Sequence, residues 1–439
     1  MAKISTTLSK VADMKHAFYI PNYDILVDSP IEIGNHEVIS FEAAGVPHEV
    51  VMYGATDYNP EQIKRDLTKI VESATAIFGE NPNEKYIFFL HHGERDAGGL
   101  EHMNSTVLGL SRWAYQYKNS YDHFLALAAH EYFHLWMVKR LKPVELEHLD
   151  YDRENYTDML WLMEGITSYY DQKIMLRAGF YDETEFLNNL LDEMSDVKNT
   201  PGSRVQSLTE ASFDAWIKYY RRDENSNNSQ ISYYTKGTII GALLDLKIIS
   251  SSGGKYSLDD VVYQLYHQFY KKEEKGLTGD DFKKAAEQAV GSSLDQFFDD
   301  YVYGTTDLDN EKYLKLAGIE LIDLNQTIND KSIGIWYSAS ACGLEVSQVI
   351  RNSSAFDNGL NVGDELIAVD DYRINEENFD QLISRYKVGD RATFTISRNG
   401  IVRSISLEIR KNTSVDYSFE MTKNPGKQQE KTYKVWMGK

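Results

Sequence analysis

The spacing of hydrophobic residues changes several times along the chain, and each change predicts a different kind of element. Up to about residue 55 the apolar runs are short and separated by turns, as at 38–42 and 49–53, which predicts strands. From Asn59 to Gly79 the apolar positions recur every three to four residues and predict one helix. The continuous run at 85–90 predicts a buried strand. We therefore expect an α/β layer in the first part of the chain.

Helical periodicity dominates the middle of the chain. Asp182 precedes the first periodic segment, and the apolar stripes lie at 186–194, 239–249, 258–270, 282–290 and 294–302. These stripes predict a mostly helical lobe. Between 307 and 330 the chain becomes polar and irregular, which predicts a domain boundary.

The last part of the chain returns to strand-like patterns. Short strands are expected at 344–350, 365–369 and 392–396, with a short helix at 379–383, so residues 331–412 are predicted to form a compact β-rich module. The tail at 413–439 is polar until its last few residues, where Trp436 and Met437 are predicted to dock back onto a body. The whole pattern predicts an α+β multidomain protein.

The segment His130-Glu131-Tyr132-Phe133-His134 is the strongest candidate for chemistry. An apolar run at 124–129 leads into it, with Asp122 as the predicted N-cap, so we expect the segment to lie on a helix. At about 100° per residue, His134 lies about 40° from His130 around the helix, and both imidazoles can bind one metal ion. Glu131 lies about 60° from His134 and is the candidate general base. The alternative is a pair of core histidines with satisfied hydrogen bonds.

Glu164 is an acidic residue within the otherwise apolar segment 161–170. An ionised carboxylate in such a segment is costly unless it is paired or bound to a metal ion. With the two histidines it completes the ligand arrangement of a catalytic zinc site. The alternative is a buried carboxylate in an ordinary hydrogen-bond network.

Two further segments contain candidate substrate-binding groups. Gly98 and Gly99 allow the backbone to approach a substrate closely, and Glu101 can pair with a terminal ammonium group, although a glycine turn before a solvated glutamate is the commoner situation. Tyr234 stands where a loop meets a predicted helix, and its phenol can donate a hydrogen bond to a developing oxyanion. Since the chain has 30 tyrosines, any single one is rarely catalytic.

Charge and composition exclude several classes of partner. The formal net charge of -21 over 439 residues argues against nucleic acid or an anionic membrane, and is compatible with cationic ligands such as peptide amino groups. Cys342 is the only cysteine, so no intrachain disulfide forms and zinc must use nitrogen and oxygen ligands; we expect this small side chain to be buried. No stretch reaches the length of a membrane span. The first residues lack the apolar core of a signal peptide, which favours the cytoplasm unless a leader has been removed.

Together, these residues resemble the glycyl aminopeptidase family, PDZ-carrying zinc peptidases of the thermolysin-like gluzincin group. The segments that carry the resemblance lie at 26–34, 98–102, 130–143, 161–170 and 234–237. The resemblance implies a thermolysin-like catalytic domain at 56–308, made of an α/β subdomain and the helical lobe, after a remnant of an N-terminal β-domain at 1–55. Residues 331–412 resemble a PDZ domain, with 342–345 in the position of its carboxylate-binding loop.

The resemblance also implies roles for the candidate residues. It implies that His130, His134 and Glu164 bind one zinc ion. It gives Glu131 the role of base and proton shuttle, and it gives Tyr234 the role of stabilising the oxyanion.

The substrate implied by the resemblance is a peptide with a free N-terminus. Glu101 would hold the α-amino group of this peptide, and the protein would be a zinc aminopeptidase that releases small N-terminal residues such as Gly or Ala. Leu100 and His102 depart from the motif of related aminopeptidases around this glutamate. Two other functions stay open: a zinc endopeptidase, and a peptide-binding PDZ protein with an inactive metal site. The PDZ-like module is expected to bind the C-terminus of a peptide or protein.

Overall fold

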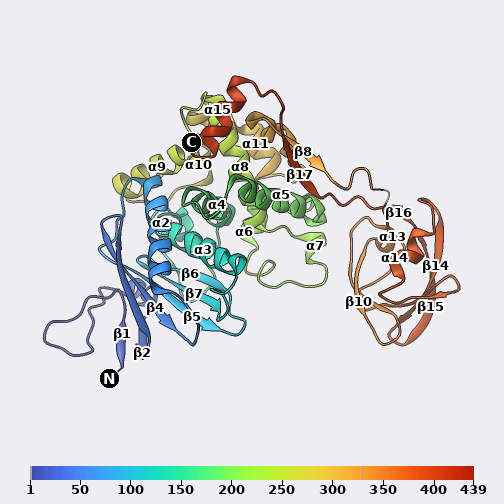
Figure 1. Ribbon diagram of the computed structural model, residues 1–439, viewed down its shortest axis with the longest axis horizontal. Coiled ribbons are helices and arrows are strands. Elements are labelled where there is room, and N and C mark those ends of the chain that lie inside the picture. The colour runs from blue at the N-terminus through green and yellow to red at the C-terminus, as the bar shows by residue number, and fades with distance from the viewer. Residues whose placement is uncertain (1, 329) are drawn as a thin grey trace.

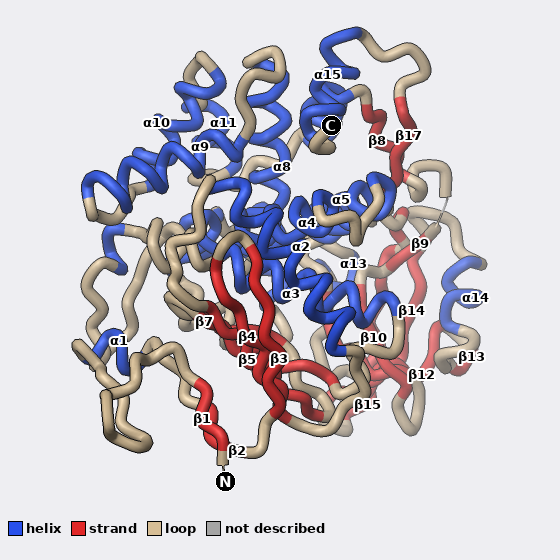
Figure 2. The backbone as a smooth tube through the Cα atoms, turned by 60° about the vertical axis from the view of Figure 1, so that its left-hand side comes forward, coloured by secondary structure: helices blue, strands red, loops and turns tan. Residues whose placement is uncertain are grey.

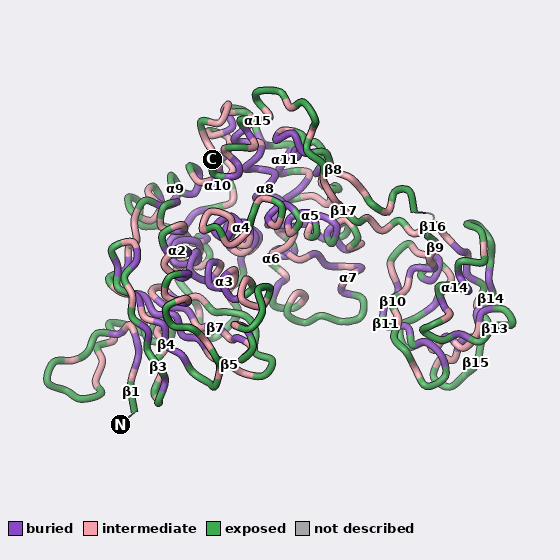
Figure 3. The backbone as a smooth tube through the Cα atoms, viewed as in Figure 1, coloured by how far each residue is buried: buried purple, intermediate pink, exposed green. Residues whose placement is uncertain are grey.

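A large body, made of helices and a main sheet, stands beside a smaller β-rich module in the computed structural model, which describes residues 2–328 and 330–439 (Figure 1). Helices of the large body pack over the sheet (Figure 2), and buried residues concentrate where these elements meet (Figure 3). This mixture of helices and sheets confirms the predicted α+β class. Within the described residues, no helix combines the length and the apolar composition needed to cross a bilayer.

The sheet of the large body has five strands in the order β3-β4-β5-β7-β6. They are β3 (Glu37–Ala43), β4 (Val46–Tyr53), β5 (Tyr86–Gly93), β6 (Gly98–Glu101) and β7 (Ser105–Ser111). Strands β4, β5 and β7 are parallel, whereas the edge strands β3 and β6 run antiparallel to their neighbours. The strands predicted at 38–42, 49–53 and 85–90 are therefore confirmed. Gly98 and Gly99 lie in the edge strand β6 and not in a free turn.

Two helices pack on this sheet. Helix α2 (Pro60–Phe78) begins and ends as predicted, because the Asn59 side chain accepts hydrogen bonds from the amides of the first turn and Gly79 has a φ of 76°. Helix α3 (Lys118–Phe133) carries the histidine segment but starts earlier than predicted. Asp122 is not its N-cap. The Asp122 carboxylate instead accepts a hydrogen bond from Lys118 at 2.7 Å, an i,i+4 pair within the helix.

The helices between residues 144 and 317 form the predicted helical lobe. They are η1 (Val144–Leu146), the π-helical turn η2 (Trp161–Gly165), α4 (Ile166–Arg177), α5 (Glu183–Asn199), η3 (Pro201–Arg204), α6 (Leu208–Phe213), α7 (Ser226–Ser229), α8 (Tyr233–Ser251), α9 (Leu258–Leu265), the π-helical segment η4 (Tyr266–Glu273), α10 (Gly279–Val290), α11 (Asp295–Tyr301), α12 (Asn310–Leu314) and η5 (Lys315–Ala317). Asp182 caps α5 through a reciprocal pair with Glu185, which confirms the predicted start of this helix.

The β-rich module has its own sheet and its own buried apolar cluster. Its elements are β9 (Lys331–Ser332), β10 (Ile335–Ala339), β11 (Leu344–Val349), α13 (Ser354–Asp357), β12 (Glu365–Val369), β13 (Tyr372–Arg373), α14 (Phe379–Ser384), β14 (Arg391–Arg398), β15 (Ile401–Glu408) and β16 (Arg410–Lys411). The sheet order is β10-β11-β12-β14-β15, with β13 beside β12, and β9 pairs with β16. The predicted strands and the short helix are confirmed. Cys342 is exposed, so the prediction that it is buried was wrong.

The module is inserted between two paired strands of the large body. The chain leaves through β8 (Ile319–Asp323) and returns through β17 (Tyr417–Met421), which pairs antiparallel with β8. At the N-terminal end of the chain, β1 (Lys3–Ser5) and β2 (Glu32–Gly34) form a separate two-stranded sheet, with α1 (Tyr23–Val27) between them in sequence. The module is thus connected to the large body by two adjacent strands.

The last helix, α15 (Lys427–Trp436), packs against the helical lobe. The Trp436 side chain is fully buried, and its indole N–H donates to the Tyr169 hydroxyl at 2.9 Å. The Tyr169 hydroxyl in turn donates to Asp245 of α8. The end of the chain therefore belongs to the core that surrounds α4.

A second contact joins the module to the large body. The Asn228 side chain in α7 donates to the Val349 carbonyl at 2.7 Å and accepts from the Arg351 amide at 2.8 Å. Asn227 donates to the Gln348 side chain at 3.1 Å. These hydrogen bonds fix the end of β11 against the segment that precedes α8.

The predicted division into domains at 1–55, 56–308, 331–412 and 413–439 stays a prediction. Strands β3 and β4 lie before residue 55, yet β4 pairs with β5, so the sheet continues across that boundary. The tail likewise contributes β17 to a sheet with β8.

Replacing Trp436 by alanine should lower the free energy of unfolding by about 3–5 kcal/mol, because it removes a large buried side chain. Urea unfolding followed by circular dichroism measures this loss. Lys434→Ala, an exposed change in the same helix, is the matched control and should leave stability nearly unchanged. Equal stability of the two variants would show that α15 contributes nothing to the core.

Candidate active site

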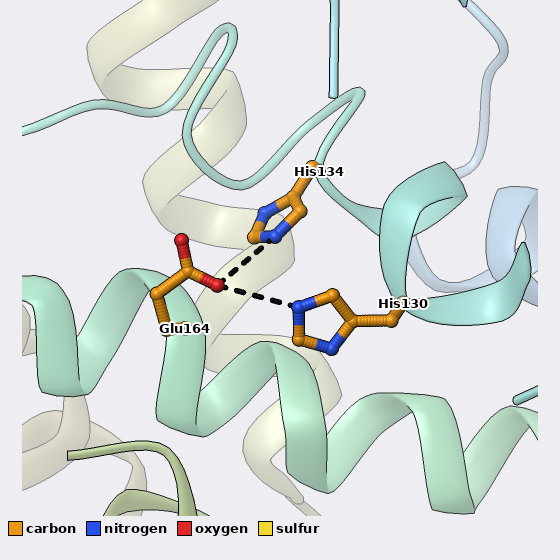
Figure 4. Close-up of side chains that lie close together, drawn as sticks. All are labelled: His130, His134 and Glu164. Carbon is orange, nitrogen blue, oxygen red and sulfur yellow. Dashed lines mark hydrogen bonds and ion pairs between the residues drawn. The ribbon is translucent and has the colours of Figure 1, made fainter. Parts of the chain in front are cut away.

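His130, His134 and Glu164 converge on one point between α3 and η2 (Figure 4). One oxygen of the Glu164 carboxylate lies 3.3 Å from His130 Nε2 and 3.2 Å from His134 Nε2. One donor atom from each residue lies within 4.8 Å of the others, which is the separation expected of groups that can share a single metal ion. The structure thus brings together the three predicted ligands.

Local backbone geometry produces this convergence. His130 lies in the last turn of α3 and His134 is its C-cap, so the two imidazoles project from the same end of the helix. Glu164 comes from η2, whose π-helical turn continues into α4. A π-helical turn is rare in proteins and is frequent at functional sites.

The other nitrogen of each imidazole is already hydrogen-bonded. His134 Nδ1 donates to the Met137 carbonyl at 2.8 Å, which leaves the lone pair on Nε2. His130 Nδ1 lies 3.0 Å from the Asp171 carboxylate. Such outer hydrogen bonds orient imidazoles toward a metal ion and make them better ligands. Both Nε2 atoms are therefore directed toward the Glu164 carboxylate.

Sequence reasoning missed Asp171. It follows Glu164 by seven residues, which is close to two helical turns, so both carboxylates lie on one face. The seven-residue spacing identifies Asp171 as a candidate, but only once the position of His130 relative to α4 is known.

Electrostatics of the three groups favour positive charge at their centre. Burial alone would lower the pKa of His134, yet the Glu164 carboxylate raises it to about 9. Burial would also lower the pKa of His130, but hydrogen bonds to Asp171 and Glu164 hold it well above its ordinary value. Burial works to raise the pKa of Glu164, and the two imidazoles outweigh it and lower that pKa. A divalent cation between these donors would satisfy the same carboxylate.

Glu131 lies beside this centre with one oxygen that no hydrogen bond satisfies. Its side chain is 5% exposed, and its Oε2 atom has no hydrogen-bond partner among the described residues. Burial raises the pKa of Glu131 to about 7. A buried carboxylate with a free oxygen and a raised pKa has the properties of a general base.

Strand β6 packs its backbone directly against this glutamate. A Cβ atom added to Gly99 would lie 2.3 Å from the Glu131 Oε1 atom, so only glycine leaves room for the carboxylate. Gly98 has a φ of 97°, which also favours glycine. Of the two glycines predicted to permit a close approach, Gly99 therefore contacts the site.

Glu101, at the end of β6, is half-buried. Its carboxylate, that of Glu131 and a ring nitrogen of His134 also lie within 4.8 Å of one another. The next two residues are held by Asp28, whose carboxylate accepts from the Met103 amide at 2.8 Å and lies 3.3 Å from His102 Nδ1. The contact with Asp28 gives the buried His102 side chain a polar partner.

The same Asp28 carboxylate accepts a hydrogen bond from Lys139 at 2.6 Å. Lys139 follows His134 by five residues, so the N-terminal segment fixes the turn after Glu101 to the loop that follows α3. Sequence reasoning included Asp28 in a resembling segment but assigned no contact to it.

Tyr234 lies in the first turn of α8, which begins at Tyr233, earlier than the periodicity predicted. The centroid of its ring is 6.2 Å from that of His130. Burial, together with the charge of Glu164, raises the pKa of Tyr234, so the phenol keeps its proton. The Tyr220 hydroxyl lies 3.4 Å from that of Tyr234 and accepts from Tyr233 at 3.1 Å; sequence reasoning did not find this residue.

Comparisons with known proteins agree with this arrangement. The family model for the M61 glycyl aminopeptidase matches residues 123–240, the Peptidase M61 N-terminal domain matches 2–35, and the PDZ domain matches 317–409. The crystal structure of an aminopeptidase N family protein from Idiomarina loihiensis is 31% identical, with a TM-score of 0.88 over 100% of this chain and 77% of that one.

Other likenesses are weak. An M1 zinc metallopeptidase from Deinococcus radiodurans is 13% identical over 70% of this chain and 62% of that one, and its TM-score of 0.46 is too low to carry an argument. A comparison with curated proteins finds no match.

The fold, the matched domains and the converging histidines and glutamates define a metallopeptidase, a hydrolase that also carries a PDZ domain. More particularly, the chain belongs to the M61 glycyl aminopeptidase family. The resemblance deduced from the sequence is thereby confirmed.

Replacing Gly99 by alanine should lower kcat for peptide hydrolysis by about 10²-fold, because the new methyl group displaces the Glu131 carboxylate. Steady-state kinetics with a dipeptide substrate measures the loss, and a thermal melt checks folding. Leu100→Ala, at an exposed position next along β6, is the control and should retain activity. Unchanged kcat in Gly99→Ala would mean that the position of Glu131 does not matter.

Proposed function

We propose that this metallopeptidase is a zinc-dependent aminopeptidase that releases small N-terminal residues, such as Gly or Ala, from peptides. The observation that carries the proposal is the convergence of His130, His134 and Glu164 beside two further carboxylates, Glu131 and Glu101. The first three residues can bind a metal ion, and the adjacent carboxylates can bind a cationic amine. The preference for small residues rests on the description of the family.

Zinc suits the donors that the chain offers. Two imidazoles and one carboxylate are a common ligand set for catalytic zinc, and both imidazoles have their outer nitrogens hydrogen-bonded, as ligands of this ion do. A zinc ion held there would polarise the scissile carbonyl and lower the pKa of a water molecule.

Glu131 is the proposed base. Its unpartnered Oε2 atom can take a proton from the attacking water, and the carboxyl group can then pass this proton to the leaving amine. The surrounding protein excludes most solvent from the group, since the side chain is nearly fully buried. Because little solvent reaches Glu131, the proton is passed to the leaving amine and is not lost to bulk water.

Tyr234 is the proposed oxyanion donor. Its raised pKa keeps the phenolic proton in place, so the hydroxyl can donate a hydrogen bond to the carbonyl oxygen as negative charge develops there. Tyr220 stands at its hydroxyl and supports its orientation.

Glu101 is the proposed partner of the substrate's α-amino group. Glu101 and Glu131 are close neighbours. An α-ammonium group paired with Glu101 would therefore bring the first peptide bond of the substrate next to the proposed base. Gly98 and Gly99 leave the substrate backbone room to approach along β6. An endopeptidase would make no use of this amine-binding group, and blocked substrates therefore distinguish the two functions.

Replacing Glu131 by glutamine should leave the zinc content unchanged and lower kcat by about 10²–10⁴-fold, because the amide cannot accept the proton. Atomic absorption measures the metal and steady-state kinetics the turnover. Full activity in the zinc-loaded variant would disprove the assignment of the base.

Replacing Glu101 by glutamine should lower kcat/KM for free-amine Gly and Ala substrates by roughly 10- to 100-fold, since a charge-assisted hydrogen bond is lost. Hydrolysis of N-acetylated analogues should barely change. Glu94→Gln, at an exposed position, serves as the control. An equal loss on free and blocked substrates would argue for an endopeptidase, and zinc binding without any hydrolysis would argue for a peptide-binding protein.

A further inference from the structure

A pocket of about 590 Å³ lies between the segment that follows α3 and the end of η4. One wall comes from residues 140–148 and the other from residues 270–276, and no proposed zinc ligand lines it. Backbone hydrogen bonds join the walls, because the Leu277 amide donates to the Lys142 carbonyl at 2.9 Å and the Val144 amide donates to the Leu277 carbonyl at 3.1 Å. The pocket is therefore formed before any ligand binds.

Arg140 lines this pocket as a buried cation without a negative partner; it is only 6% exposed. Its guanidinium donates to three neutral acceptors, which are the Met103 carbonyl at 3.0 Å, the Leu135 carbonyl at 2.7 Å and the Asn83 side chain at 2.6 Å. The Tyr270 ring adds a distant cation–π contact at 5.9 Å. Among residues 2–328 and 330–439, no carboxylate pairs with Arg140 and nothing accepts from its Nε atom. A negative group in the pocket would therefore stabilise it.

Lys142 is a second cation of the same wall, and it has no ion pair within the described part of the chain. Burial, together with the charge of Lys139, lowers the pKa of Lys142, so a nearby negative group would also stabilise this ammonium. The other two lysines of the lining already have carboxylate partners: Lys271 with Glu80, and Lys275 with Glu273. The positive charge available to a ligand is thus that of Arg140 and Lys142.

The lining also has two carboxylates that make no ion pair with another described residue, those of Glu147 and Glu274. Glu147 is half-buried and accepts a hydrogen bond from the Gly276 amide, which holds its carboxylate at the second wall. These acidic groups would repel a polyanion such as inorganic phosphate. A ligand with one carboxylate and one ammonium group can instead pair with both kinds of side chain.

Arg140 also connects this pocket with the candidate active site. The Leu135 carbonyl that it binds comes directly after His134, and the Met103 carbonyl comes two residues after Glu101. A ligand in contact with Arg140 therefore acts on a side chain that holds both of these segments.

We propose that this pocket binds a free amino acid. The carboxylate of the ligand lies against Arg140 Nε and the Lys142 ammonium group, and its own ammonium group lies against the Glu147 carboxylate. The volume of the pocket leaves room for the side chain of the ligand. Amino acids are the products of the aminopeptidase reaction, so the choice of this ligand rests in part on the proposed function.

Isothermal titration calorimetry with L-alanine tests the proposal. The full, zinc-loaded chain carries Glu131→Gln so that amide analogues are not hydrolysed. L-alanine should bind, and affinity should fall by about tenfold or more for alaninamide, which lacks the carboxylate, and for N-acetylalanine, which lacks the ammonium group. Adding Lys142→Ala should weaken L-alanine binding by a similar factor, because a charged hydrogen bond is lost.

Lys272→Ala is the matched control, since this lysine is exposed on η4 and does not line the pocket. It should bind L-alanine as the parent does, and thermal melts compare its folding with that of Lys142→Ala. Glu147→Gln is a second test: it should weaken binding of L-alanine and leave that of N-acetylalanine unchanged. Glu101→Gln should keep the binding, because Glu101 belongs to the candidate active site and not to this pocket.

Four results would overturn the proposal: equal binding of L-alanine and alaninamide, unchanged binding by the Lys142→Ala variant, tighter binding of inorganic phosphate than of L-alanine, or loss of L-alanine binding in Glu101→Gln but not in Lys142→Ala. The last result would place the amino acid in the candidate active site. Failure of the proposed function is a separate outcome, since absence of peptide hydrolysis by the parent chain would refute the peptidase activity and leave the binding result unaffected.

Discussion

The candidate active site depends on a contact between η2 and α8, where the backbones touch because each element has a glycine at the crossing. A Cβ atom added to Gly165 would lie 2.5 Å from the Cα atom of Gly237, and one added to Gly237 would lie 2.7 Å from the Cα atom of Gly165. Glu164 adjoins the first glycine, and Tyr234 precedes the second by less than one helical turn. The close approach of η2 and α8 therefore sets the separation between a proposed metal ligand and the proposed oxyanion donor.

Most buried charged groups in this region have a hydrogen-bond or ion-pair partner. Glu164 lies between two imidazoles, one imidazole is held by Asp171 and the other by a backbone carbonyl, and Asp28 holds the turn after Glu101. In contrast, the Oε2 atom of Glu131 is buried and has no hydrogen-bond partner among the described residues. The unsatisfied group is thus the one whose proposed role requires it to bind and release a proton.

The sequence predicted those parts of the site that depend on local periodicity. The pairing of His130 with His134 follows from helical spacing, and Glu164 was conspicuous as an acid in an apolar segment. Contacts made by the crossing of elements could not be predicted: Asp171 reaches His130 only because α4 packs on α3, and Tyr220 reaches Tyr234 across a loop. The start of α3 was misjudged because Asp122 resembles a cap but pairs with Lys118. The loop at 342–345 stays a predicted carboxylate-binding loop, and the contact of its Cys342 amide with Glu365, which is distant in sequence, could not be predicted.

Helix α7 connects the PDZ domain to the segment that leads into α8. Asn228 holds the end of β11, and only five residues separate it from Tyr234. Linkage between binding sites is reciprocal. If a peptide bound to the PDZ domain changes the affinity for substrate through the Asn228 contact, substrate must change the affinity for that peptide by the same factor. The PDZ domain is inserted between β8 and β17 and has α7 as a third point of attachment, so a ligand that shifts this domain must also strain its contact with the segment that leads to Tyr234.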